Sequence, residues 1–365
     1  MKVRCNRHEL AEALAAIGGV VAARTPKPIL QGVLIEAHAD HCLLAATDLE
    51  VGIRFVVTQV EVDDQGTSVV PADKLGQIVR ELADEVILLE TEDSVCHVRG
   101  QGSHFQIYAQ DPADFPPVAQ LEGEPDFEIE ADALHRMAEW TVFAAARENT
   151  RYAINGILWA KEKDVLTLAG TDGRRLSRAR GKLASGGGGS LESIVPVKAM
   201  NLLQRILGEN GSTVAVKLSS NQLVVKSARA TLSTGLVEGQ FPNYQDVVPT
   251  DCNCSVHLKT ADFLSAVRRA ALLTNEESKG VRLSFRNDSL TFSSRAPAQG
   301  EATITLPISY SAPELDIGFN PVFLVDVLRV VHTDEVTMEL KEANRPGVIS
   351  CDPNLLYVVM PVNLS

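Results

Sequence analysis

A block of residues recurs three times along the chain, and this repeat limits the possible folds more than any other feature of the sequence. In each copy a glycine opens an apolar run, a polar turn follows, and a second apolar run completes a pattern typical of a β-hairpin. The glycines are Gly32, Gly156 and Gly280, 124 residues apart each time. The middle copy, from Arg151 to Leu176, shows the pattern most clearly. A period of this length predicts several copies of one domain in tandem.

Proline residues keep nearly the same period. Pro71, Pro196 and Pro321 stand 125 residues apart, and each opens a stretch whose apolar residues have helical spacing. Proline is favoured at the first helical position because its missing N–H has no partner there, so we expect each proline to begin a helix. Thr260 and Asn320 are candidate helix caps.

A second helical pattern opens each copy, near Leu10, Leu134 and Leu264. The first of these helices has Asn6 as a candidate cap and Glu9 three residues later, which is the spacing of a capping box. Helices and hairpins together predict an α+β chain of three domains. The expected domain bounds are 1–125, 126–250 and 251–365.

Two further stretches predict local structure. The alternating runs Val86–Glu90, Val95–Arg99 and Ser103–Tyr108 indicate strands at a sheet edge. The run Ser185–Ser190 contains four consecutive glycines. It lacks the lysine, the Ser or Thr and the following helix of a phosphate-binding loop, so it is expected to be a flexible tether.

The composition is that of an ordinary globular protein, with 45% hydrophobic and 22% charged residues in a chain of 365. No stretch approaches the roughly 18 uninterrupted apolar residues that a membrane span needs. The six cysteines include only one close pair, Cys252 and Cys254. That spacing is a poor zinc site, so we expect free thiols, no metal and no cofactor, in the cytoplasm.

The formal net charge of −13 argues at first sight against nucleic acid. Charge acts over only about 8 Å at physiological salt, however, so its local placement decides. Acidic residues concentrate in expected strands and loops, whereas basic residues recur on or beside expected helices. These bases are either ordinary solvated helix faces or a basic helical surface on an acidic body, and charge alone favours the first interpretation.

One turn differs between the copies. Thr47–Val51 aligns with Thr171–Arg175, and only the middle copy has a glycine followed by two arginines there. The third copy has Arg295 and Ala296 at this place. Thr-Asp-Gly alone predicts a plain turn. Its elaboration in one copy of a repeat favours a binding site found only on the middle domain.

Over nearly its whole length the chain resembles the bacterial replicative sliding clamps, the beta subunits of DNA polymerase III. The segments that carry the resemblance are Lys27–Leu30, Thr47–Glu50, Asp114–Pro116, Arg151–Tyr152, Asn155–Gly156, Thr171–Gly173, Arg175–Leu176, Phe241–Pro242, Tyr244, Gly280–Leu283, Ile317–Asn320 and Tyr357–Pro361. None is specific alone, but all of them in order on three repeats are.

The resemblance implies three clamp domains per chain, with helices lining a central hole and antiparallel sheets outside. Two chains would close head to tail into a six-domain ring around double-stranded DNA at a primed template. The ring would have no catalysis of its own. It would be loaded by a clamp loader, and it would tether the DNA polymerase III alpha subunit, other DNA polymerases and repair proteins to DNA at the nucleoid, away from membranes.

The resemblance also implies three sets of site residues. Arg24 would face DNA by the resemblance itself, and Lys198 and Arg205 by their positions on helices. A groove between the second and third domains would bind short apolar peptide motifs of partners. Its residues would be Ile154, Thr171, Gly173, Arg174, Arg175, Leu176, Pro242, Val247, Asn320, Phe323, Val358, Val359, Met360, Pro361 and Val362.

The third set is the dimer interface. Phe105 and Ile107 on an edge strand of one chain would meet Leu272 and Leu273 of the other. The simpler alternative, that these four residues belong to the core, is about equally well supported by the sequence.

Two rival functions belong to other classes. A hydrolytic or acid/base enzyme would need convergent catalytic groups, and the sequence contains no GxSxG or HExxH motif and no metal-ligand spacing. A scaffold that binds only proteins could use the same fold. Retention on nicked circular DNA that is lost on linearisation would distinguish a clamp from both.

Overall fold

The computed structural model describes residues 1–22, 24–146, 153–186, 188–207, 211–274, 280–297 and 299–363. Arg151 and Tyr152, which belong to the resemblance, lie outside these residues. The chain divides into two compact units. The first consists of Met1–His135, Leu183–Gly188 and Lys198–Leu236, and the second of Arg136–Lys182, Gly189–Val197 and Val237–Ser365. The division passes through the middle repeat, because each of its two sheets continues into a neighbouring repeat.

Six α-helices of the described residues follow the predicted repeat. The helices that open the repeats are α1 (Arg7–Gly18), α3 (Ala131–Val142) and α5 (Thr260–Ala271), with 12 residues each. Those that follow the prolines are α2 (Ala72–Glu81), α4 (Val197–Ile206) and α6 (Pro321–Val330), with 10 residues each. Both sets of helices are therefore confirmed.

The position of proline was predicted correctly only once. Pro321 is the first residue of α6, but Pro71 caps α2 and Pro196 ends the strand before α4. In the first two repeats the proline still pairs in the sheet, with Gly32 and Gly156 respectively. The helix begins one residue later as a result.

The cap of α1 is half of the predicted box. The Asn6 side chain accepts hydrogen bonds from the backbone N–H of His8 and Glu9. The buried Glu9 carboxylate does not return to Asn6; it accepts from Thr58 N and Oγ1 and from Gln59 N at 3.1, 3.2 and 2.7 Å. Donors of Thr58 and Gln59, distant in sequence, therefore bind the Glu9 carboxylate in place of the backbone N–H of Asn6.

Two other predicted caps had opposite outcomes. Asn320 caps α6 by accepting from Val322 N at 3.0 Å. Thr260 does not cap α5, because it is the first helical residue and its hydroxyl donates to the Thr333 carbonyl at 2.7 Å.

The first unit contains two antiparallel sheets. One has the order β5-β1-β7-β8-β9 and the other the order β10-β15-β16-β17-β4-β3-β2-β6. The strands are β1 (Lys2–Asn6), β2 (Gly32–Ala37), β3 (Cys42–Thr47), β4 (Val51–Val57), β5 (Val60–Asp64), β6 (Gly66–Pro71), β7 (Val86–Glu92), β8 (Val95–Gly100), β9 (Ser103–Tyr108), β10 (Phe127–Glu130), β15 (Thr213–Leu218), β16 (Gln222–Lys226) and β17 (Ala230–Gly235). The short 3-10 segments are η1 (Pro28–Gln31) and η2 (Pro112–Asp114). The three predicted strands β7, β8 and β9 are thus confirmed, but only β9 lies at the sheet edge, because β7 and β8 pair on both sides.

The second unit has the same plan. Its sheets have the orders β14-β11-β12-β13-β25-β24-β23-β18 and β21-β20-β19-β22. The strands are β11 (Gly156–Glu162), β12 (Val165–Thr171), β13 (Arg175–Lys182), β14 (Ser190–Pro196), β18 (Cys254–Lys259), β19 (Val281–Arg286), β20 (Ser289–Ala296), β21 (Gly300–Pro307), β22 (Leu315–Phe319), β23 (Glu335–Leu340), β24 (Gly347–Ser350) and β25 (Leu355–Val359). A 3-10 segment, η3 (Tyr244–Val247), precedes the third repeat.

Two seams join consecutive repeats through continuous sheets. In the first unit β17 pairs with β4, with Leu232 opposite Ile53. In the second unit β25 pairs with β13, with Val358 opposite Leu176. All four of these residues are buried.

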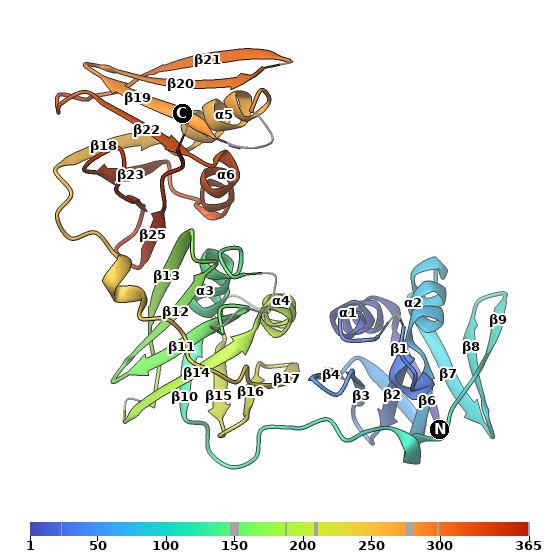
Figure 1. Ribbon diagram of the computed structural model, residues 1–365. Helices are drawn as coiled ribbons and strands as arrows, with labels where there is room; N and C mark the ends of the chain where they lie inside the picture. The colour runs from blue at the N-terminus through green and yellow to red at the C-terminus, as the bar shows by residue number, and fades with distance from the viewer. Residues whose placement is uncertain are drawn as a thin grey trace. The chain divides into compact units, whose positions relative to one another are not determined.

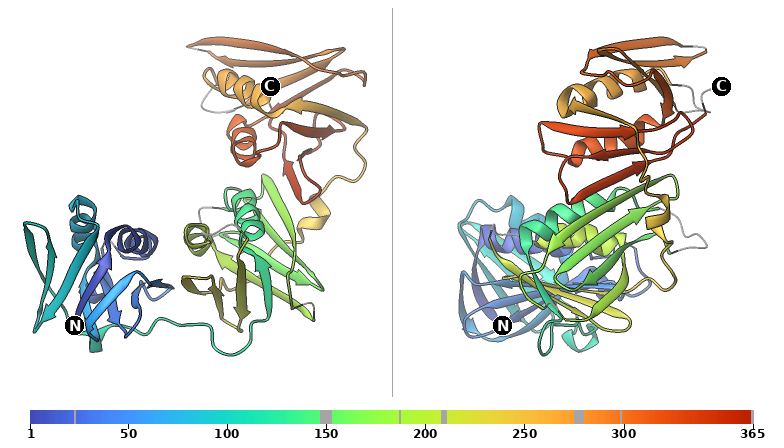
Figure 2. Two further views of the ribbon diagram at one scale, coloured as in Figure 1. Left: turned by 180° about the vertical axis from the view of Figure 1, so that it is seen from behind. Right: turned by 90° about the vertical axis from the view of Figure 1, so that its left-hand side faces the viewer.

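The core of each unit lies between its sheets and its helices. Helices α1 and α2 lie side by side in the first unit, and α5 and α6 in the second (Figures 1 and 2). Phe263 on α5 and Phe292 on β20 are fully buried, with ring centroids 5.8 Å apart. The alternation read from the sequence therefore places apolar side chains toward the helices.

The two ends of the glycine-rich run are hydrogen-bonded to neighbouring segments. Ser185 N donates to the Glu128 carbonyl, and its hydroxyl donates to the Glu128 carboxylate at 3.0 Å. The buried Lys161 donates from Nζ to the Gly189 carbonyl at 3.3 Å, and Ser190 already belongs to β14. Neighbouring strands thus bind both ends of the run, and the flexible tether between them stays a prediction.

The six cysteines are free thiols. Within the described ranges no helix is long and apolar enough to cross a membrane. The same residues contain no group of three or more His, Cys, Asp or Glu that could hold a metal ion.

Candidate functional site

An apolar cavity lies where β13 and β25 join the middle and third repeats. It encloses about 220 Å³. Ten of the predicted groove residues line it: Ile154, Thr171, Gly173, Arg174, Arg175, Leu176, Pro242, Val247, Val358 and Met360. Leu176 and Val358 are buried in its floor, whereas Val247 and Met360 are 50% and 40% exposed. Exposed apolar side chains around a cavity are typical of a surface that binds another protein.

The turn after β12 gives the cavity its rim. Thr171 Oγ1 donates to the Arg175 carbonyl at 2.6 Å and accepts from Gly173 N at 3.1 Å. Asp172 Oδ1 accepts from the backbone N–H of Arg174 and Arg175 at 2.9 and 3.1 Å. Gly173 has a φ of +83°, which favours glycine. The Thr-Asp-Gly segment thus folds as the plain turn that the sequence predicts and also lines the cavity.

Arg175 is bound beneath this turn. Its guanidinium forms ion pairs with Asp172 at 3.0 Å and Asp326 at 2.7 Å, and it donates to the Phe143 carbonyl at 2.7 Å. It also lies 4.5 Å from the ring centroid of Phe323. Burial works against the charged form of Arg175, but the hydrogen bond that it donates to Asp326 raises its pKa overall. Arg175 therefore supports the cavity and is not a free cation.

Phe323 and Tyr357 fix the wall behind Arg175. The Tyr357 hydroxyl donates to the Phe323 carbonyl at 2.9 Å, and burial raises the pKa of this phenol. Phe323 therefore contacts Arg175, which lines the cavity, but does not line the cavity itself.

Four other predicted groove residues do not line the cavity either. Asn320 caps α6, and Val359 is buried in β25 opposite Arg175. Pro361 and Val362 instead line a second cavity of about 710 Å³ with Met360, Arg282 and Asp316 among others. Met360 thus lies between two hollows.

The chain end is attached by its backbone. Met360 N donates to the Arg174 carbonyl at 2.9 Å, and Val362 N donates to the Gly318 carbonyl at 2.8 Å. The side chain of Met360 is consequently presented at the rim of the cavity.

Sequence reasoning missed two lining residues, Asn243 and Tyr244. Both lie at η3, directly after Pro242. The Phe-Pro pair was a usable signal, because its equivalent Phe115-Pro116 lines a cavity of about 460 Å³ in the first repeat.

The three residues predicted to face DNA have different surroundings. Arg24 is exposed. Lys198 forms an ion pair with Asp48. Burial of Asp48 would raise its pKa, but the hydrogen bonds from Lys198 and from the backbone N–H of Val51 lower it overall. Lys198 is therefore partly neutralised within the chain.

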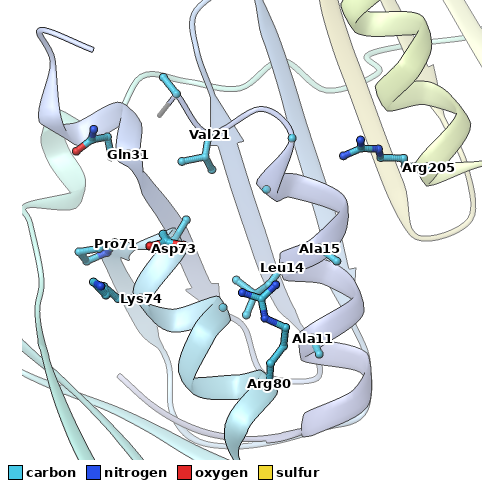
Figure 3. Close-up of a pocket in the computed structure, with 15 residues that line it drawn as sticks. Ala11, Leu14, Ala15, Val21, Gln31, Pro71, Asp73, Lys74, Arg80 and Arg205 are labelled. Carbon is cyan, nitrogen blue, oxygen red and sulfur yellow. The ribbon is translucent and has the colours of Figure 1, made fainter. Parts of the chain in front are cut away.

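Arg205 lines a cavity of about 750 Å³ in the first unit. Lys74 and Arg80 on α2 also line it, and Figure 3 shows both of them with Leu14 on α1 and with Arg205, which reaches from α4. Asp73, on the same wall, accepts from Gln77 at 2.9 and 3.0 Å. Lys74 and Arg80, which the sequence did not single out as site residues, thus join Arg205 around a basic hollow.

Two of the four predicted interface residues lie on β9, and the other two follow the last residue of α5. Phe105 and Leu272 are 38% and 77% exposed. Ile107, on β9 as Phe105 is, is buried, and Leu273 at the end of α5 is half-buried. The alternative that all four belong to the core therefore does not hold for Phe105 and Leu272.

Known proteins resemble this chain over its full length. Three family models of the DNA polymerase III beta subunit match it: the N-terminal domain over residues 1–119, the central domain over 128–243 and the C-terminal domain over 245–363. The beta sliding clamp of Escherichia coli (strain K12) is 32% identical over 372 residues, and that of Chlamydia pneumoniae 30% over 365. The alignments cover 100% of this chain and 100% and 99% of those proteins.

Solved structures agree with the sequence matches. A sliding clamp from Pseudomonas aeruginosa, crystallised with griselimycin, superposes with a TM-score of 0.94 at 30% identity, and one from Bacillus subtilis with 0.92 at 26%. Both comparisons cover 100% of each chain. Three clamp domains of mixed helix and antiparallel sheet, matched in order and at full length, show that the chain belongs to the DNA polymerase III beta subunit family, the beta sliding clamps, which are non-catalytic processivity factors.

Proposed function

We propose that two copies of this chain close head to tail around duplex DNA and tether DNA polymerase to it. The resident partners would be the primed duplex and the polymerase III alpha subunit. A clamp loader would open and close the ring, and other polymerases and repair proteins would use the same groove. A protein with these partners works at the bacterial nucleoid.

The repeated seam is the observation that carries this proposal. β4 and β13 are the equivalent end strands of the first and middle repeats, and each pairs with the last strand of the following repeat, β17 or β25. Two equivalent strands of the described chain lie at open sheet edges. β21 of the third repeat corresponds to β4 and β13, and β9 of the first repeat corresponds to β17 and β25. Pairing β9 of one chain with β21 of another would build the same seam again. A symmetric pair of such contacts closes, as head-to-tail interfaces do when the rotation permits.

Side chains near these two edges fit an interface. Exposed Leu272 follows α5, the helix that packs on β20 and β21, and exposed Phe105 lies on β9. We propose that these two side chains become buried when the edges pair, next to the already buried Ile107 and the half-buried Leu273. A pair of open edges with apolar neighbours would otherwise favour aggregation.

We propose that the cavity at β13 and β25 binds a short apolar segment of each partner. The floor is apolar, and the mobile thioether of Met360 adapts to different side chains. Asn320, Val359, Pro361 and Val362 would act around this cavity rather than in its lining.

Weak cationic contacts would hold the duplex without stopping it from sliding. Arg24, Arg205, Lys74 and Arg80 are candidates for these phosphate contacts, and Lys198 is a weaker one because Asp48 occupies it. Contacts to phosphate alone carry no sequence information, as a clamp requires.

Retention on DNA of different topology tests the function. Labelled protein loaded on a nicked circle should co-elute with the DNA and be released after linearisation by a restriction enzyme. The solution mass should be twice 39.4 kDa. Equal retention on linear and circular DNA, or a stable monomer, would contradict the ring.

A further inference from the structure

Arg178 has a buried donor that no described residue satisfies. Its Nε is buried without a hydrogen-bond partner. Burial lowers the pKa of this guanidinium, and the positive charge of Arg180 lowers it further, whereas an adjacent carboxylate would raise it. A buried donor without an acceptor costs about 1–3 kcal/mol, so its retention calls for an explanation.

Arg178 lies on the same sheet face as the cavity floor. It is two residues beyond Leu176 on β13, so both side chains leave the strand on one side. Its cross-strand neighbours are Ala169 on β12 and Leu356 on β25. Ala169 and Leu356 pack in one cluster with Leu176 and with Tyr244, which also lines the cavity. A segment that fills the cavity and continues along this face would meet Arg178.

The first repeat contains the same arginine with its partner present. Arg54 stands opposite Ala45 on the neighbouring strand, as Arg178 stands opposite Ala169. Its guanidinium donates to the Glu36 carboxylate and to the Val118 carbonyl, both at 3.5 Å. Glu36 thus supplies a carboxylate from β2.

The middle repeat lacks this carboxylate. Ala45 pairs with Leu34 and Ala169 with Leu158, so the residue two positions further, Glu36 in the first repeat, corresponds to Ala160 in the middle repeat. The same sheet position therefore carries the carboxylate of Glu36 in the first repeat, where residues of that repeat alone line the cavity. In the middle repeat, beside the candidate groove, it carries only the methyl group of Ala160.

We propose that Arg178 is a specificity-determining residue of the groove and receives a carboxylate of the bound partner segment, in the place that Glu36 fills opposite Arg54. This inference rests on the proposed peptide groove. The favoured partner segments combine an apolar anchor for the cavity with an Asp or Glu nearby. An arginine is suited to this because its planar donors match a carboxylate.

The test compares peptides that differ in one charge. Short capped peptides with a central pair of leucines carry Asp at one flanking position at a time, and each has an Asn counterpart. Fluorescence anisotropy with the full-length protein should find an Asp peptide that binds about tenfold more tightly than its Asn counterpart, the usual effect of a charge-assisted hydrogen bond.

Three variants assign that preference to a residue. Arg178→Met removes the cation, and Ala160→Glu installs the acid of the first repeat, so each should reduce the preference for Asp to about one. Glu36→Ala is the matched control in the first repeat and should leave the preference intact.

The results distinguish a failure of the role of Arg178 from a failure of the groove itself. A preference that survives Arg178→Met, or Asp and Asn peptides that bind the wild type equally, would overturn the role of Arg178 and leave the groove standing. Leu176→Glu should abolish binding of both series. If neither series binds the wild type, the groove itself is wrong and the role of Arg178 is wrong with it.

Discussion

Leu49 and Gly173 occupy the same place in two copies of one turn. Their φ angles are +80° and +83°. In the first repeat Thr47 Oγ1 accepts from Leu49 N, and Asp48 Oδ1 accepts from Glu50 N and Val51 N, which matches the bonds at Thr171 and Asp172. The hydrogen bonds of threonine and aspartate therefore hold this turn even with a leucine in a conformation that favours glycine.

Replacing Leu49 by glycine should stabilise the protein. Relief of the left-handed strain is worth about 1–2 kcal/mol, and the greater freedom of glycine in the unfolded chain offsets about 0.5–1 kcal/mol. The Leu49 side chain is 56% exposed, so little burial is lost. Urea unfolding should show Leu49→Gly more stable by roughly 1 kcal/mol, and Gly173→Ala less stable by a similar amount. A destabilised Leu49→Gly variant would show that the leucine side chain contributes more than its conformation costs.

Lys198 and Arg205 should differ as DNA contacts. Lys198 is engaged by Asp48, whereas Arg205 lies at the basic hollow with Lys74 and Arg80. Arg205→Ala should therefore weaken binding to a short linear duplex more than Lys198→Ala does. Asp48→Asn releases Lys198 and should strengthen binding, while its effect should vanish in the Lys198→Ala background. Equal losses in the two alanine variants would mean that DNA displaces Asp48 from Lys198.

At the scale of elements, the sequence predicted what depends on local pattern. Both helices of every repeat and the hairpins after Gly32 and Gly156 follow from apolar periodicity. The failures depend on contacts between distant segments: Glu9 turned to residues 58–59, and two prolines remained in sheet pairing. Tyr244 lines the cavity from the 3-10 segment η3, and such a short segment leaves no periodic pattern in the sequence. Arg178 became visible only once strand register aligned it with Arg54.

The open edges should determine association. Leu272→Glu places a charge on an exposed residue that the proposed interface buries, so it should produce monomers of about 39.4 kDa with an unchanged circular dichroism spectrum. Val322→Glu is the matched control, because Val322 is 55% exposed on α6 and belongs to neither of the proposed edges. Multi-angle light scattering measures both. Dimers of Leu272→Glu at micromolar concentration would move the interface elsewhere.

At the scale of the whole molecule, an acidic chain that is held on DNA by encircling it should bind only weakly to DNA from which it can slide off. Affinity for a short linear duplex should fall steeply with salt, by a factor on the order of 10³ between 50 and 200 mM if about six phosphates are contacted. Protein already loaded on a nicked circle should stay bound over the same range. Parallel loss from both substrates would show that charge alone retains the protein.

The shared seam has a consequence for how such an assembly is divided into polypeptides. Every repeat has one strand equivalent to β4 and one equivalent to β17. A junction within a chain and a junction between chains can therefore form by the same strand pairing. Where the polypeptide is interrupted then has no bearing on closure; only the total of six modules does. Three chains of two modules, or one chain of six, would complete the same circle, and a circularly permuted gene that starts at the middle module should still encode a working protein.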